Sequence, residues 1–315
     1  MKILRHALLP VLIAAGFAAG SAQAAVIVND WQINLEAATL AGENLDGTIS
    51  GIDQITYQGI AQGTTYDSDA VAGLSEGDRG VTYGLLAATA YVVGGTPVPG
   101  QTDTSVLGID YELTFTFEVD NVITNVDGLN TNSIHPAEGS AGMLTDGILK
   151  VYIDNLGDAT GLTASTETGT GFDDGTLVAT FRVIGGEVVF SFESLDGADD
   201  ATFELVSALA GVILDSDGND LTTGALLALT DSNFDADLND DGIPDVPAPS
   251  SLTDIGGDLC PGPNSLACVD NGNFFAEEDG SVRIAAAVPE PASLGLLGAG
   301  LLGLAWQRRR RPHAV

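Results

Sequence analysis

Residues 111–119 alternate apolar and polar side chains without a break. This period of two is what a chain needs to form a β-strand with two different faces. One face would carry Tyr111, Leu113, Phe115, Phe117 and Val119, and the other would carry Glu112, Thr114, Thr116 and Glu118. The pattern predicts an antiparallel strand with one buried face and one face in water.

Further strand-like segments follow the same pattern and are separated by turn residues, and no long amphipathic helix competes with them. They are residues 52–59, 81–93, 147–154, 202–214 and 281–286, with turns expected at 127–128 and 196–197. The dipeptide Gly185-Gly186 predicts a two-residue hairpin turn, which would place Val183 opposite Val188. Together with 40 glycines, these signals predict an all-β fold, an antiparallel β-sandwich of jelly-roll type.

The predicted domain organisation has three parts. Residues 1–24 form a signal peptide, residues 25–287 form one acidic β-sandwich domain, and residues 288–311 form a C-terminal signal. Within the domain, residues 231–280 are rich in Asp, Pro, Gly and Ser and lose the apolar alternation. This stretch is predicted to be a long loop or insertion before the last strand.

The N-terminus is typical of a secretory signal peptide. Lys2 and Arg5 precede an apolar run, residues 7–19, and Ala22 and Ala24 then supply the small residues that signal peptidase accepts. We expect cleavage after Ala24. A retained anchor is the alternative, but the apolar run is short for a membrane span.

The C-terminus combines a proline-bounded acid, an uncharged stretch and a basic block. Pro289-Glu290-Pro291 precedes residues 292–306, which carry no charge, and Arg308, Arg309, Arg310 and Arg311 follow. Prolines disfavour helix on their N-terminal side, so a single hydrophobic helix is expected just after them. Fifteen helical residues rise about 22 Å, which is less than the roughly 30 Å of a bilayer core. The arginines would remain in the cytoplasm and place the acidic domain outside.

These residues resemble the PEP-CTERM sorting signal of Gram-negative bacteria: Val288-Pro289-Glu290-Pro291-Ala292-Ser293-Leu294, the Gly- and Leu-rich helix and the arginine block. The resemblance covers about the last 27 residues. It implies recognition by an exosortase, removal of the helix after transient anchoring in the inner membrane, and transfer to the cell surface or extracellular matrix. A plain single-pass anchor is the alternative.

The family is associated with exopolysaccharide and with biofilm or floc formation. The chain is also similar to flocculation-associated PEP-CTERM proteins in Asn29-Asp30-Trp31 at the start of the mature chain and in residues 147–154. The resemblance therefore implies a surface or matrix protein, with anionic exopolysaccharide or the outer surface as its partner. From its residues we do not expect the protein to be an enzyme.

The charge of the chain excludes one class of partner. The two ends hold six of the ten basic residues, which leaves 43 acidic and four basic residues in between. Nucleic acid is not expected as a partner, because phosphate neutralisation requires clustered Lys and Arg. Cations are plausible partners, and a hydrated, self-repelling surface is the simpler explanation of the acidity.

One acidic segment has the spacing of a calcium loop. Its candidate ligands are Asp235, Asp237, Asn239, Asp241, the carbonyl of Ile243 and Asp245. Oxygen ligands at alternate positions, with Gly242 allowing the turn around the ion, suit Ca²⁺. The last ligand position holds Ala248, so the alternative is an Asp-rich solvated turn. Residues 215–220 are a second, poorer candidate, because Asx-Gly runs are ordinary turn material.

Cys260 and Cys268 are the only cysteines, and an exported protein is in an oxidising compartment. They are predicted to form a disulfide, which would stabilise the folded state by about 2 to 3 kcal/mol in the entropic model.

Two other functions are alternatives. Residues 73–77 match G-x-S-x-G, but no helix is expected after them, which argues against a hydrolase. A carbohydrate-binding module could use exposed aromatic residues such as Tyr57, Tyr66 or Tyr91 as sugar platforms.

Overall fold

The computed structural model describes residues 25–38, 47–66, 75–99, 111–126, 139–154, 171–191, 196–221, 225–235 and 268–287. Apart from Ala25 and Ala287, these residues belong to one unit, Val26–Ala286, while the two chain ends form a second unit. The elements in chain order are β1 (Ala25–Ile27), β2 (Trp31–Asn34), α1 (Leu35–Ala38), β3 (Thr48–Tyr66), β4 (Arg79–Val93), β5 (Thr96–Pro99), β6 (Glu112–Val126), β7 (Gly139–Asp154), β8 (Thr176–Ser191), β9 (Asp196–Ala208), β10 (Ile213–Leu214), β11 (Ala225–Asp235) and β12 (Cys268–Ala287). The described structure is therefore almost entirely β, as predicted.

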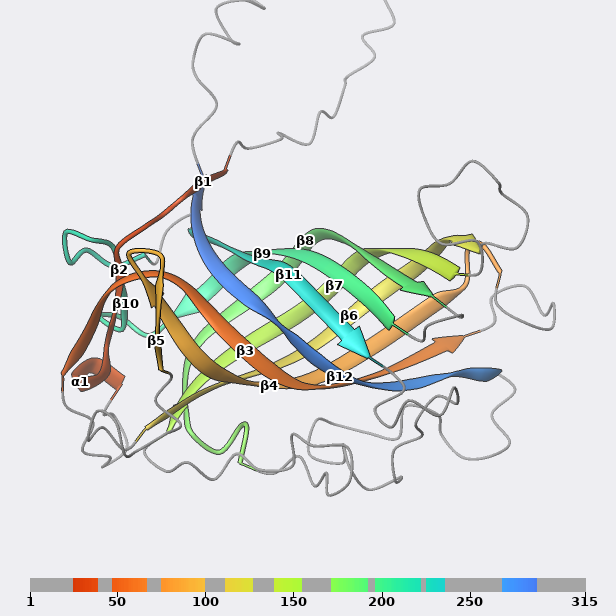
Figure 1. Ribbon diagram of the computed structural model, residues 1–315, viewed down its shortest axis with the longest axis horizontal. Coiled ribbons are helices and arrows are strands. Elements are labelled where there is room, and N and C mark those ends of the chain that lie inside the picture. Colours follow the sequence, from red (N-terminus) through yellow and green to blue (C-terminus); the bar gives the residue numbers. More distant parts are fainter. Residues whose placement is uncertain are drawn as a thin grey trace, which may run out of the picture. The chain divides into compact units, whose positions relative to one another are not determined.

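Eight of the strands form a closed antiparallel barrel (Figure 1). The order is β3-β4-β6-β7-β8-β9-β11-β12, and β12 pairs back with β3, for example Val282 with Ile55. The short strands β1, β2 and β5 pair with β12, β3 and β4, and β10 pairs with β2. The antiparallel all-β class is confirmed, but one sheet closes on itself in place of the two facing sheets of a sandwich.

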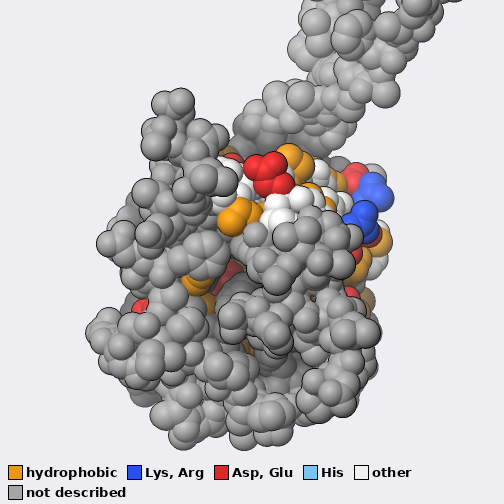
Figure 2. Space-filling view, turned by 90° about the vertical axis from the view of Figure 1, so that its right-hand side faces the viewer, with side chains coloured by type: hydrophobic (Ala, Val, Ile, Leu, Met, Phe, Trp, Pro, Cys, Tyr) orange, Lys and Arg blue, Asp and Glu red, His pale blue; other side chains and the backbone are white. Residues whose placement is uncertain are grey.

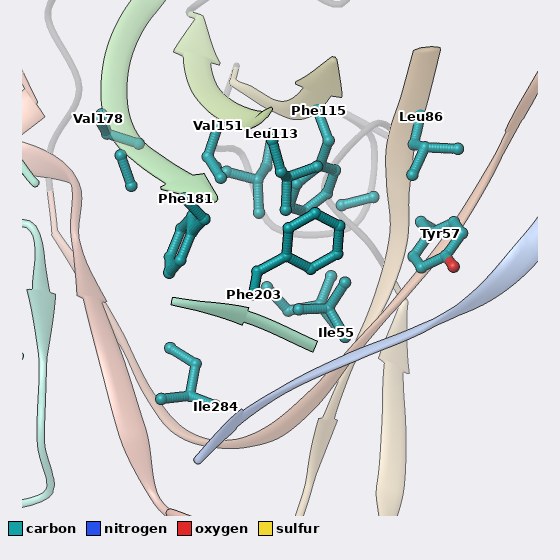
Figure 3. Close-up of a cluster of buried hydrophobic side chains, with 14 of the residues drawn as sticks. Ile55, Tyr57, Leu86, Leu113, Phe115, Val151, Val178, Phe181, Phe203 and Ile284 are labelled. Carbon is teal, nitrogen blue, oxygen red and sulfur yellow. The ribbon is translucent and has the colours of Figure 1, made fainter. Parts of the chain in front are cut away.

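The interior of the barrel is packed with large apolar side chains (Figure 3). Those that converge in the view include Ile55, Leu113, Phe115, Val151, Phe181, Phe203 and Ile284. They come from β3, β6, β7, β8, β9 and β12, which are six of the eight barrel strands. A small cavity of about 30 Å³ lies among them. Burial of this apolar surface is the main favourable contribution to folding.

One end of the barrel is closed by the segment that precedes β3 (Figure 1). Trp31 and Ile33 of β2 and Leu35 of α1 are buried in the core cluster together with Val212, which precedes β10. Backbone hydrogen bonds fix this arrangement: the Asn34 amide donates to the Val212 carbonyl over 2.8 Å. Residues 31–35 therefore extend the hydrophobic core at this end of the barrel.

The predicted inward face of β6 is confirmed, whereas its outer face is less exposed to solvent than predicted. Leu113, Phe115, Phe117 and Val119 are buried, but Glu112, Thr114 and Thr116 are buried as well, and of the polar set only Glu118 is exposed. The Thr114 hydroxyl donates to the Phe172 carbonyl over 2.8 Å, so the segment before β8 covers this face.

The hairpin predicted at Gly185-Gly186 is wrong. β8 continues through both glycines, and the register between β8 and β9 shifts there, between Val183 and Gly185. Neither glycine has a positive φ. A Cβ on Gly186 would lie 2.3 Å from the Asp200 carbonyl oxygen, so this glycine allows a close strand approach at a bulge. The turn predicted at 196–197 is also wrong, because β9 begins at Asp196.

The predicted strands at 52–59, 81–93, 147–154 and 281–286 lie within β3, β4, β7 and β12. The strand predicted at 202–214 is wrong as one element, because β9 ends at Ala208 and residues 209–212 separate it from β10. Residues 231–235 and 268–280, which composition assigned to the insertion, belong to β11 and β12. The turn at 127–128 and the C-terminal hydrophobic helix lie outside the described residues. Within the described ranges, no helix has the length and hydrophobicity needed to cross a membrane.

Candidate functional site

Four polar side chains from four strands meet inside the barrel, farther along the strands from β2 than the apolar core. They are Tyr57 of β3, Asp199 of β9, Ser232 of β11 and Glu278 of β12, and we call them the buried acidic cluster. Pairing explains why they meet. Ser232 is the register partner of Asp199. Glu278 lies in β12, two residues before Gly280, which is the register partner of Tyr57. Ser232 is 1% exposed, Tyr57 2% and Glu278 3%.

The geometry of the cluster depends on one glycine. A Cβ on Gly280 would lie 2.6 Å from Tyr57 Oη and 2.9 Å from Ser232 Cα, so the tyrosine hydroxyl occupies the space that a side chain would need. Ser232 Oγ donates to Glu278 Oε1 over 3.1 Å. Tyr57 Oη and Asp199 Oδ1 are buried and have no hydrogen-bond partner among the described residues.

The electrostatics of the cluster follow from burying two acids together. Burial raises the pKa of the Glu278 carboxyl well above its usual range, and the Asp199 charge raises it further. Burial also raises the pKa of Asp199, with a smaller contribution from Asp200, and the pKa of the Tyr57 hydroxyl. The nearby Ser232 hydroxyl offsets part of each shift, and none of these groups has a Lys or Arg among the causes of its shift.

A cavity of about 310 Å³ adjoins the cluster beside β8, β9 and β11. It is lined by Glu187, Val189, Ala198, Asp199, Asp200, Ser232 and Asn233. β11 changes register between Thr230 and Asn233, so Ser232 lies at a bulge where the cavity meets the cluster. Asp199 and Ser232 belong to both, and the cavity therefore gives access to the buried acids.

The described surface around the barrel is also poor in positive charge. In Figure 2, Asp and Glu side chains appear on several parts of the described surface, whereas Lys and Arg gather at one edge. Arg182 pairs with Glu204, and Arg283 donates to Gln54 Oε1 over 2.8 Å. These arginines are engaged outside the buried acidic cluster.

Chemically, the cluster offers two carboxylates and two hydroxyls. Such a donor set suits a hard cation or a shared proton. Among the described residues no group of three or more His, Cys, Asp or Glu side chains is arranged to hold a metal ion.

Sequence reasoning missed this cluster. The inward positions of β12, which are Ala276, Glu278, Gly280, Val282 and Ile284, continue one alternation. The signal was present but lay beyond the predicted strand at 281–286.

Of the predicted calcium ligands, the structure describes only Asp235, the last residue of β11. Asp235 pairs in register with Glu277, and its charge, after burial, raises the pKa of Glu277. Acidic groups thus gather at the end of β11, where the predicted loop begins.

Several predicted site residues lie outside the described residues. They are Asp237, Asn239, Asp241, Ile243, Asp245, Cys260, the cleavage residues Ala22 and Ala24, and the sorting residues at 289–291 and 308–311. Cys268 begins β12, and the disulfide stays a prediction.

The second calcium candidate, residues 215–220, is an Asx-type turn. Asp215 Oδ1 accepts hydrogen bonds from the backbone amides of Asp217 and Asn219, at 2.9 and 2.8 Å. The bonds from Asn219 are the main reason why the pKa of Asp215 is lowered. Asp220 Oδ1 accepts from the Gly211 amide over 2.6 Å. Both carboxylates therefore stabilise local backbone.

Two features considered for other functions have structural roles. Ser75 donates through its amide and hydroxyl to Asp78 Oδ2, and β4 follows at Arg79, so this turn lacks the helix of a nucleophile elbow. Tyr57 and Tyr91 are buried and are not exposed sugar platforms; the Tyr66 side chain lies outside the description. The Tyr111 hydroxyl donates to the Tyr91 hydroxyl over 3.1 Å inside the protein.

Comparison with known families identifies the C-terminus. A family model described as the PEP-CTERM protein-sorting motif matches residues 287–310. The chain carries a PEP-CTERM sorting signal. No curated protein and no solved structure matches the chain.

The PEP-CTERM motif confirms the resemblance seen in the sequence. It indicates an exported protein that is anchored transiently in a membrane and cleaved, with an exosortase as the processing partner. The match begins at Ala287, the last residue of β12, so the sorting signal follows the barrel directly.

Proposed function

We propose that this PEP-CTERM protein is a component of the cell surface or extracellular matrix of a Gram-negative bacterium, associated with exopolysaccharide in a biofilm or floc. The observation that carries the proposal is the sorting motif at residues 287–310. The flocculation-type assignment is supported by residues 29–31 and 147–154. In the fold, Trp31 is buried in the core cluster at one end of the barrel, and residues 147–154 lie in β7.

The processing order follows from the two ends of the chain. Signal peptidase would cleave after Ala24 during export, and the arginine block would hold the tail in the cytoplasm. Exosortase would then act at Pro289-Glu290-Pro291 on the outer side. The released unit would be the barrel, with β1 and β12 close to its new ends.

Calcium would connect the acidic protein to an anionic polysaccharide. Both polymers are negative, so direct association is opposed by charge repulsion, and a divalent ion that shares carboxylates of both would reverse this. The loop from Asp235 to Asp245 is the proposed bridge. The Cys260–Cys268 disulfide would constrain the same segment between β11 and β12.

Mass spectrometry of the mature protein tests the sorting step. We expect an N-terminus at Ala25 and loss of the hydrophobic segment 292–306. Glu290→Gln and replacement of the four arginines by glutamine should leave the full tail in place and the protein in the inner membrane. Glu277→Gln, a carboxyl change outside the motif, is the matched control and should be processed normally. Intact protein in the cytosol, or normal maturation of both sorting variants, would contradict the proposal.

Deletion of the gene tests the matrix role. Cells without the protein should aggregate less, and wild-type protein should restore aggregation only when calcium is present. Complementation with Asp241→Ala should restore less aggregation than wild type. Unchanged aggregation after deletion would count against a matrix role while leaving the sorting result intact.

A further inference from the structure

We propose that the buried acidic cluster of Tyr57, Asp199, Ser232 and Glu278 is a binding site for a divalent hard cation, with Ca²⁺ as the expected ion. The site lies inside the barrel and is distinct from the loop predicted at residues 235–245. It does not depend on the proposed matrix function.

The donor set is the first argument. Four oxygen-bearing side chains from four different strands point to one region, and none carries nitrogen or sulfur. Ca²⁺ takes six to eight oxygen ligands and accepts irregular geometry, whereas softer metals prefer His and Cys. Asp199 and Ser232 also line the cavity of about 310 Å³, which provides room for the water ligands that would complete the coordination.

The unpartnered atoms are the second argument. Tyr57 is 2% exposed, and its hydroxyl lies over Gly280, beside Ser232, without a hydrogen-bond partner among the described residues. Asp199 Oδ1 is buried and equally unpartnered. Leaving a buried polar atom unpaired costs about 1 to 3 kcal/mol, so two such atoms at one place indicate a missing ligand.

The charge is the third argument. The negative charges of Asp199 and Glu278 repel each other in a low-dielectric interior. Asp200 and Asp279, on the same two strands, add to the negative potential. A cation would satisfy both carboxylates, while a shared proton would satisfy only one. The two alternatives differ in a measurable way, because binding a cation to protonated carboxyls releases protons.

The test uses the mature exported protein in which Asp237→Asn and Asp241→Asn remove the predicted loop. Calorimetric titration with CaCl₂ in two buffers of different ionisation enthalpy should show binding with proton release, and Kd should lie around 10⁻⁴ to 10⁻³ M, as in extracellular calcium modules. Tb³⁺ added in place of Ca²⁺ should luminesce on tyrosine excitation, because Tyr57 adjoins the site. Tyr57→Phe should remove most of that emission.

Substitutions inside and outside the barrel separate specific binding from general attraction. Glu278→Gln and Asp199→Asn should weaken calcium binding at least about tenfold, because each removes one of two ligand charges. Asp279→Asn is the matched control: it is the next residue in β12 and is exposed, so a much smaller change is expected.

Three results would overturn the proposal: no calcium binding once the loop is removed, unchanged affinity in Glu278→Gln, or an equal loss in Asp279→Asn. Circular dichroism verifies that each variant folds. If the carboxyl variants do not fold, Tyr57→Phe decides the question, and terbium emission that persists in this variant would refute the site.

Discussion

The barrel interior has two regions that differ in chemistry although β3, β9 and β12 contribute to both. In the apolar region, Phe115, Phe181 and Phe203 belong to the core cluster, and the cavity that Phe115 and Phe181 line measures about 30 Å³. In the buried acidic cluster, Tyr57, Ser232 and Glu278 are as buried as the apolar core, Asp199 is half-buried at the cavity, and two of the cluster's oxygens lack partners. Along β12 the change takes four residues, from Glu278 to Val282.

The comparison shows that position in a strand determines which way a side chain points, whereas the chemistry of the side chain determines whether burial stabilises the fold. Closure of the sheet turns one face of every strand toward the interior, whichever residue occupies the position. At Val282 burial stabilises the fold, whereas at Glu278 it opposes ionisation. The apolar region must therefore supply the stability that allows the acidic cluster to exist.

The largest effect is expected in the apolar region. Phe203 is 1% exposed and belongs to the core cluster. Phe203→Ala would leave a cavity and should lower the free energy of unfolding by about 3 to 5 kcal/mol. Urea denaturation measures the loss. The control is Val206→Ala on the same strand, where the side chain is 56% exposed and a change within about 0.5 kcal/mol is expected. Equal losses in both would mean that the apolar region does not dominate stability.

The next effect concerns the space above Gly280. Gly280→Ala would place a Cβ 2.6 Å from Tyr57 Oη, and the resulting overpacking should cost about 1 to 3 kcal/mol. Tyr57→Phe in the same background should recover part of this loss, which a double-mutant cycle quantifies. Gly185→Ala is the matched control, because nothing lies within 4 Å of its added Cβ. A Gly280→Ala protein as stable as wild type would show that the tyrosine does not need this space.

The pH dependence of stability should separate the two regions. Burial and the Asp199 charge raise the pKa of Glu278 in the folded protein above the unfolded value of about 4.3. Protonated Glu278 therefore makes its full contribution to the free energy of unfolding below pH about 4. This contribution is lost as pH rises through the folded pKa, and the free energy of unfolding then falls by at most about 1.4 kcal/mol per pH unit. Glu278→Gln removes this slope.

Urea denaturation at a series of pH values in the presence of a chelator checks this expectation. The difference in free energy of unfolding between Glu278→Gln and wild type should grow in favour of the variant as pH rises. Asp200, Asp279 and Tyr57 remain in both proteins, whereas the Asp199 charge acts on Glu278 only in the wild type, so the difference reports the titration of the Glu278 and Asp199 pair. Parallel curves would show that Glu278 titrates as it does in the unfolded chain.

The sequence predicted individual strands better than their assembly. The inward side chains of β6 followed from local alternation, because the side-chain period is a property of the strand itself. Burial of Thr114 did not, since Phe172, far away in sequence, covers it. Closure depends on pairing between β3 and β12, such as Ile55 with Val282, and alternation is the same in a sandwich and in a barrel.

The buried acidic cluster was hidden for a related reason. Glu278 lies in a stretch of Glu, Asp and Gly, whose low strand propensity favours a loop. Pairing with β3 and β11 makes this stretch a strand, and only then does the alternation place Glu278 inside. Asp199 and Ser232 join it through register and a bulge, which sequence spacing does not reveal.

The smallest effect is expected on the outer surface, where, in contrast to both interior regions, side chains are exposed to solvent. Arg182 donates from Nε to Glu204 Oε2 over 2.9 Å, and the two side chains are 59% and 39% exposed. Solvent screens such a pair, so Arg182→Ala should change the free energy of unfolding by about 0.2 to 1 kcal/mol, and less at high salt. A double-mutant cycle with Glu204→Ala isolates the coupling. A coupling that approaches the loss in Phe203→Ala would mean that cross-strand ion pairs, and not the apolar interior, hold β8 against β9.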